Sequence, residues 1–101
     1  MRKEAFLSML GLCRRAGRLI LGHDPVLESL HRGRAKFVVL AEDFSPRSGK
    51  GILEAAQDMG VPVKTLPIPM ETLSWAVGKR AGVFACEDTG FAGKLQELCD
   101  D

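Results

Sequence analysis

The stretch from residue 18 to residue 41 restricts the possible folds most, because it reads as a strand, a helix and a second strand in close succession. Its opening apolar run stops at Gly22. Asp24 followed by Pro25 then predicts a helix with Asp24 as the N-cap and the proline at the first helical position. The continuous apolar run 37–41 is typical of a strand that is covered on both faces. The stretch therefore predicts a βαβ unit as the nucleus of the fold.

The rest of the chain continues this alternation of helices and strands. Apolar residues recur at helical spacing over four further segments, and short apolar runs predict two more strands. The expected helices are 2–15, 46–59, 70–77 and a last one capped by Asp88 or Thr89, and the further strands are 61–66 and 83–86. Helix 46–59 is expected to bury four apolar side chains, those of Ile52, Leu53, Ala56 and Met59. We therefore expect one α/β domain over residues 1–101, a three-layer α/β/α sandwich around a four-stranded mixed sheet.

Composition is ordinary for a globular protein. At 101 residues, with 46% apolar and 27% charged residues, the chain is large enough for one core without metal or disulfide staples. It contains no run of about eighteen apolar residues that could span a bilayer and no hydrophobic leader, so we expect a cytoplasmic protein. The three cysteines are odd in number and form no CxxC pair, which predicts reduced thiols, no metal site and no cofactor.

The net charge of +1 hides a strong asymmetry along the chain. Residues 1–36 carry eight Lys or Arg against three Asp or Glu, whereas the remainder carries six against ten. A basic half of this kind indicates an anionic partner such as nucleic acid, although surface charge without a partner explains it about equally well.

Two predicted loops combine glycine with polar or cationic side chains. One is 22–24, and the other is 78–82, which contains Lys79 and Arg80. In α/β folds, strand ends and helix N-termini collect ligands because unsatisfied N–H groups point outward there. These loops are the predicted binding surface. Within them, His23 either contacts a base or phosphate or is a plain turn residue.

Enzymatic motifs are weaker than these loop signals. The segment 48–51 is similar to the end of a P-loop, but that motif requires glycine in place of Phe44 and Ser or Thr in place of Gly51. Glu42-Asp43 after a buried strand could bind a metal, but acids in this position more often cap the following helix. Neither histidine has a partner that suggests an activated nucleophile. We therefore expect no catalytic activity and no small-molecule substrate, and a Mg-dependent phosphotransfer domain that uses Glu42 and Asp43 remains an alternative.

A longer pattern connects the separate signals. In order, the chain carries Gly22-x5-Glu28-x4-Gly33-x-Ala35-Lys36, the apolar run 37–41, Glu42-Asp43, Val61-Pro62-Val63 and Leu73-x-x-Ala76-x-Gly78. This order and spacing resembles the kink-turn-binding ribosomal-protein superfamily, whose members are found in the large ribosomal subunit and in small ribonucleoproteins. Segments 78–81 and 88–95 are most similar to its small bacterial YlxQ-like branch. The similarity covers nearly the entire chain.

The resemblance implies an α/β/α sandwich that clamps the sheared G·A pairs of an RNA kink-turn. In that family the glycine loop and the helix after it form the clamp, and a second loop covers a flipped-out nucleotide. Gly22 matches the loop glycine that permits close backbone approach. The segment 78–83 matches the second loop, in which Lys79 and Arg80 would contact phosphates or bases. A basic βαβ unit that reads RNA shape is consistent with this role.

The chain departs from the family pattern at the start of the helix. Asp24, Pro25 and Glu28 stand where kink-turn binders have Asn-Glu and, one turn on, lysine, and Ser74 replaces a common glycine. Ionised carboxylates cannot donate hydrogen bonds and would face the charge of the phosphates. An RNA footprint shifted toward the arginines is therefore a further hypothesis, and these are Arg14, Arg15, Arg18, Arg32 and Arg34.

The predicted function is that of a non-catalytic protein that binds structured RNA, either a kink-turn or an rRNA-like element, with no membrane partner. The predicted RNA-binding residues are Arg18, Gly22, His23, Asp24, Glu28, Arg32, Arg34, Lys36, Gly78, Lys79 and Arg80. The main alternative is a protein-interaction module that retains the fold and has lost kink-turn recognition.

Overall fold

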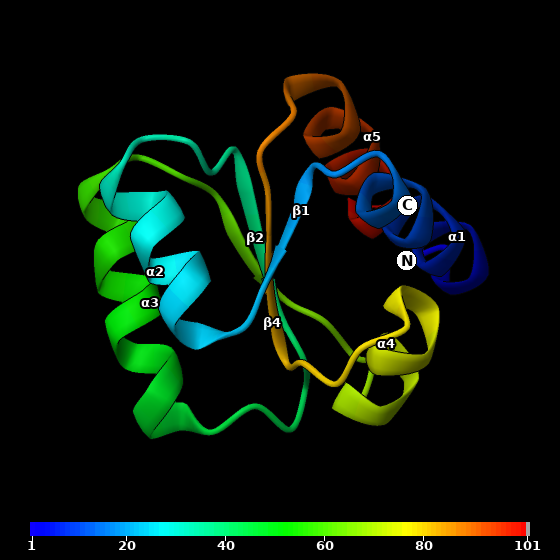
Figure 1. Cartoon of the computed structure of the whole chain (residues 1–101). Coiled ribbons are helices and arrows are strands. Elements are labelled where there is room, and N and C mark those ends of the chain that lie inside the picture. The colour runs from blue at the N-terminus through cyan, green and yellow to red at the C-terminus, as the bar shows by residue number, and fades with distance from the viewer. Residues whose placement is uncertain (101) are drawn as a thin grey trace.

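The structure is a computed structural model that describes residues 1–100. Within them, four strands form one sheet and helices cover both of its faces (Figure 1). The elements in chain order are α1 (Lys3–Arg15), β1 (Leu19–Leu21), α2 (His23–His31), β2 (Phe37–Leu40), α3 (Pro46–Asp58), β3 (Val63–Thr65), α4 (Met70–Val77), β4 (Val83–Cys86) and α5 (Thr89–Asp100). The predicted α/β/α sandwich with a four-stranded mixed sheet is confirmed.

The strand order is β1-β4-β2-β3, so β4 lies between the two strands of the expected βαβ unit. β2 pairs with β3 in parallel, whereas β4 runs antiparallel to both β1 and β2. A helix is about 10 Å wide and neighbouring strands lie about 4.8 Å apart, so a crossover through α2 readily spans two strand spacings. The elements of the unit are present, but its two strands do not pair with each other.

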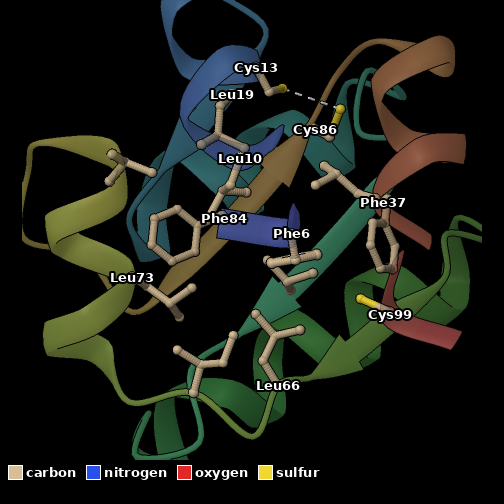
Figure 2. Packing of buried hydrophobic residues seen from close by; sticks show 14 of the residues in the cluster. Phe6, Leu10, Cys13, Leu19, Phe37, Leu66, Leu73, Phe84, Cys86 and Cys99 are labelled. Carbon is tan, nitrogen blue, oxygen red and sulfur yellow. Dashed lines mark hydrogen bonds between the residues drawn. The ribbon is translucent and has the colours of Figure 1, made fainter. Parts of the chain in front are cut away.

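Side chains of the sheet alternate between its two faces. On β4, Phe84 and Cys86 point to the layer of α1, α4 and α5, whereas Val83 and Ala85 point to the layer of α2 and α3. Figure 2 shows the first layer, in which Phe6 of α1 lies close to the sheet. Both faces are covered, which explains why β2 and β4 are continuous apolar runs rather than alternating ones.

Helix α2 begins earlier than predicted, because Gly22 rather than Asp24 is its N-cap. The carbonyl oxygen of Gly22 accepts the first helical hydrogen bond, from the N–H of Val26 at 3.0 Å. Gly22 has φ 98°, a left-handed conformation in which glycine is the favoured residue, so the chain passes from strand to helix at this single position. Pro25 consequently lies in the first turn, where its missing N–H leaves no helical bond unmade.

Helix α3 buries Ile52 and Ala56 as predicted, but the prediction was wrong for Leu53 and Met59. Leu53 is 46% exposed and Met59 is 44% exposed. Leu53 is rotated by about 100° from Ile52 around the helix axis, and Met59 is the C-cap rather than part of the last turn. The small side chain of Ala55 occupies the inward position instead.

The remaining elements agree closely with the predicted ones. β3 is shorter than expected and is an edge strand, as Pro62 at its start indicated. Helix α4 covers 70–77 as predicted. Asp88 caps α5, because its carboxylate accepts a hydrogen bond from the N–H of Phe91 at 2.8 Å.

The cysteines are free and buried. The sulfur atoms of Cys13 and Cys86 lie 3.6 Å apart in the core (Figure 2). The hydrogen bond between them, together with burial, raises the pKa of the Cys13 thiol well above its usual range. Burial raises the pKa of Cys99 from 9.0 to about 11. Both thiols are therefore protonated near neutral pH.

None of the helices within residues 1–100 has the length and apolar character that a membrane span requires.

Candidate nucleic-acid interface

The sheet brings the two predicted loops together at one end, which we call the loop end. β1 ends there, and β4 begins there (Figure 1). The N–H of Gly22 donates to the carbonyl oxygen of Val83 at 3.0 Å, and the N–H of Ala41 donates to that of Gly82 at 2.8 Å. Segments that are roughly sixty residues apart in sequence thus form one surface.

Ser74 of α4 fixes the second loop. Its hydroxyl donates to the carbonyl oxygen of Ala81 at 3.2 Å and accepts a hydrogen bond from the N–H of Ala81 at 3.1 Å. Beside it, Gly82 is buried so closely against Phe44 and Met70 that a Cβ there would lie 2.8 and 2.6 Å from their side chains. The serine that replaces a common family glycine therefore has a structural role, and the loop is held from both sides.

The second loop presents two cations at the surface. Lys79 and Arg80 are both exposed. With Glu71 and Trp75 they line an open hollow of about 340 Å³. Trp75 was not predicted as a site residue, although its position two residues from the buried Leu73 on α4 places it on the outward side of the helix.

The first loop and α2 carry the acidic residues, each with a basic partner. Nδ1 of His23 lies 2.8 Å from Oδ1 of Asp24, whose side chain is 94% exposed near the positive end of the α2 dipole. One turn on, Nε of Arg32 lies 2.9 Å from Oε1 of Glu28. An exposed pair at this spacing contributes only about 0.3–0.5 kcal/mol, but it neutralises a carboxylate that was expected to face RNA.

The other predicted cations lie at the opposite end of the sheet, and they are Arg18, Arg32, Arg34 and Lys36. The carbonyl oxygen of Arg18 accepts a hydrogen bond from the N–H of Glu87 at 2.9 Å, and the N–H of Lys36 donates to the carbonyl of Cys86 at 2.7 Å. Both contacts are at the carboxyl end of β4, about 13 Å from the loop end for a four-residue strand. The structure therefore separates the predicted site residues into two groups, which α2 connects.

The acid pair after β2 has a structural partner. Oδ1 of Asp43 accepts a hydrogen bond from the N–H of Met70 at 2.8 Å, so this carboxylate caps the first turn of α4. Among the described residues, no group of three or more His, Cys, Asp or Glu side chains is placed to hold a metal ion. Asp43 thus has the capping role that acids after strands commonly have, although it caps α4 rather than the next helix in the chain.

Comparison with known proteins places the chain in one family. Residues 4–95 match the model of the Ribosomal protein L7Ae/L30e/S12e/Gadd45 family. The chain belongs to this family. It is 37% identical over 93 residues to the RNA-binding protein YlxQ of Bacillus subtilis (strain 168), covering 91% of this chain and 92% of that protein. It is 31% identical over 98 residues to the RNA-binding protein YlxQ of Enterococcus faecium, covering 97% and 94%.

Two solved structures share the fold of this chain. A protein of unknown function from Bacillus halodurans C has a TM-score of 0.90 at 32% identity, covering 95% of this chain and 97% of that one. The 15.5kD RNA binding protein of Giardia lamblia has a TM-score of 0.73 at 21% identity, covering 93% and 81%, which shows the shared fold. The resemblance to the superfamily and to its YlxQ-like branch is confirmed.

Proposed function

We propose that this L7Ae-family chain is a non-catalytic, cytoplasmic RNA-binding protein that recognises a kink-turn, or a similarly bent element, in ribosomal or other structured RNA. The observation that carries the proposal is the hydrogen bond between Gly22 and Val83, because it holds the two glycine loops side by side. The relatives named RNA-binding protein YlxQ support RNA as the partner.

The two loops would make different contacts with the RNA. Lys79 and Arg80 supply the positive charge for phosphate contacts, on a loop that is already fixed. Gly22 has no side chain to keep the RNA away from the start of α2. The exposed carboxylate of Asp24 repels phosphates at the start of α2. Phosphate contacts therefore belong to the second loop.

The experiment that tests the proposal compares two labelled RNAs across a salt series. One is a kink-turn and the other is a matched duplex without the bulge. We expect tighter binding to the kink-turn at every salt concentration, because both RNAs offer phosphates but only one offers the bent shape. The slope of log K against log[salt] should correspond to about 0.7–0.9 per phosphate contact.

Charge reversal on the second loop is the matching test on the protein. We expect the double variant Lys79→Glu, Arg80→Glu to bind the kink-turn at least about tenfold more weakly, with a shallower salt slope. The double variant Lys64→Glu, Lys94→Glu changes net charge equally. Lys64 lies on β3 at the sheet edge opposite β1, and Lys94 lies on α5, so this control should bind nearly as well as the wild type.

A third double variant, Arg32→Glu with Arg34→Glu, tests the shifted footprint at the opposite end of the sheet. We expect a smaller loss than for the loop variant, because Arg32 is already paired with Glu28. A larger loss would move the main RNA contact to that end.

The remaining outcomes decide between the alternatives. Equal, weak and steeply salt-dependent binding to both RNAs would mean that the protein contacts phosphates without recognising the kink. Affinity no better than the non-specific range of about 10⁻⁴–10⁻⁶ M for either RNA would favour a protein-interaction module.

A further inference from the structure

Trp75 stands out because a large aromatic side chain is rarely left in water. It is 81% exposed, whereas Leu73 and Val77 on the same helix are buried. The inward positions of α4 are thus filled without it, and Trp75 contributes little to the core. An exposed aromatic of this size at a binding surface is typical of a contact residue.

Two hollows meet at this side chain. One is the hollow of about 340 Å³ that Lys79 and Arg80 line. The other, of about 550 Å³, lies between α1 and α4 and is lined by Leu12 and Arg15, with Trp75 common to both. Leu12 is itself 44% exposed, so the surface next to the indole is apolar as well.

The charges around the indole favour a polyanion with flat apolar groups. Arg15 lines one hollow, and Lys79 and Arg80 line the other, against one carboxylate, that of Glu71. An aromatic ring between cations is the arrangement that single-stranded nucleic acid uses, with a base stacked on the ring and phosphates beside the cations. A protein partner would need several acidic residues around an apolar group to gain as much from this surface.

We infer that Trp75 is a stacking platform for an unpaired base of the bound RNA. The phosphates next to that base would lie toward Arg15 on one side and toward the second loop on the other. The inference rests on the proposed function and extends the RNA footprint from the loop end onto the outer face of α4. Because every base has a π-face, the platform would accept an unpaired nucleotide of any sequence.

The chain offers a direct optical test, because Trp75 is its single tryptophan. The probe is a kink-turn RNA with an unpaired bulge, together with a series in which each bulge nucleotide in turn is abasic. Stacking should quench the intrinsic fluorescence of the wild type on titration. Trp75→Ala should lower the affinity by roughly five- to 150-fold, and Trp75→Phe should keep part of it.

At one position of the bulge, removing the base should lower the affinity of the wild type about as much as Trp75→Ala does. The same abasic RNA should bind the Trp75→Ala variant no more weakly than the intact RNA does, because the stacking contact is already absent. The matched control is Leu53→Ala, which removes an exposed apolar side chain from α3 in the other helical layer and should leave affinity unchanged. Circular dichroism should be the same for all variants, since neither side chain is in the core.

Kink-turn binding with unchanged fluorescence, and equal affinity in Trp75→Ala, would overturn the inference and leave the proposed function standing. Failure of the wild type to bind any of the RNAs would overturn both. A wild-type dimer in sedimentation that Trp75→Ala lacks, with RNA binding equal in the two, would assign the surface to a second copy of the chain and also overturn the inference.

Discussion

Gly22 has a conformation that other residues adopt only at a cost. Its φ of 98° lies at the point where β1 ends and α2 begins. Gly22→Ala should lower the free energy of unfolding by about 1–2 kcal/mol, because Cβ crowds the backbone when φ is positive. The nearest side-chain atom would be Cδ of Pro25 at 3.7 Å, so the loss comes from backbone strain rather than from a clash. Denaturant unfolding measures the change.

Gly51→Ala is the matched control for this substitution. Gly51 lies within α3 with open space around it and no positive φ. We expect that variant to gain up to about 1 kcal/mol, because alanine is the better helix former. If both variants lost stability equally, the conformation of Gly22 would not be the cause.

Asp24 places a negative charge on the surface that we propose to bind RNA. Its carboxylate is almost fully exposed at the loop end, with His23 as its neighbour. Asp24→Asn removes a negative charge facing the phosphates, and at about 1 kcal/mol for charges 4 Å apart in water the affinity for RNA should rise up to about fivefold. A filter-binding titration at low salt measures it. A weaker complex would instead mean that the carboxylate accepts a hydrogen bond from a base.

Sequence reasoning at this scale narrowed the cap of α5 to two residues. Asp88 or Thr89 was predicted to cap this helix, and Asp88 does. The prediction was wrong at the start of α2, where Asp24 has the better cap side chain. The strand pairing holds Gly22 in the sheet, so the helix begins before Asp24 can cap it.

Helix α2 is joined to the end of β4 by one short hydrogen bond. The hydroxyl of Ser29 donates to Oε2 of Glu87 at 2.6 Å, and Ser29 is the buried polar residue of the described core. Ser29→Ala leaves this acceptor without its partner, so the free energy of unfolding should fall by about 1–2 kcal/mol. Ser8→Ala on the exposed side of α1 should change it by less than about 0.5 kcal/mol. Thermal or urea unfolding of the two variants measures both changes, and equal losses would mean that the hydrogen bond of Ser29 does not contribute.

The elements themselves were largely predictable, because caps, glycines and apolar runs are local signals. Helix α4 was predicted with its observed limits, from Met70 to Val77. The pairing of the strands was not predictable, because nothing in the apolar run of β4 indicates which strands lie beside it. Its place between β1 and β2 depends on how α2 crosses the sheet.

The molecule as a whole should lose stability at alkaline pH. Burial raises the pKa of Cys99 from 9.0 to about 11, so the unfolded chain releases this proton first as the pH rises. The folded state then holds more protons than the unfolded state, and the free energy of unfolding should fall between about pH 9 and pH 11 by up to roughly 2 kcal/mol.

Urea unfolding at a series of pH values measures this loss. Cys99→Ala should reduce the dependence on pH over that window. The hydrogen bond between Cys13 and Cys86 raises the pKa of the first thiol and lowers that of the second, so the contributions of this pair oppose each other. If the free energy of unfolding of Cys99→Ala fell with pH as steeply as that of the wild type, other groups would be responsible for the loss of stability.

The candidate site could be predicted only in pieces. Both loops were identified from glycine next to polar or cationic residues, but their contact depends on the pairing of β1 with β4. The same pairing places Arg18 and Lys36, which the sequence grouped with the loops, at the opposite end of the strands. Trp75 was left out because the chain has no tyrosine and few aromatic residues, which argued against base stacking on aromatic side chains.

The position of β1 at the sheet edge has a consequence for a chain that is being synthesised. Its strand neighbour in the sheet is β4, which leaves the ribosome last among the strands. Until residues 83–86 emerge, the N–H of Gly22 lacks the carbonyl of Val83. Nascent chains that already display Lys79 and Arg80 therefore do not yet have the two-loop surface, which forms only after β4 has emerged.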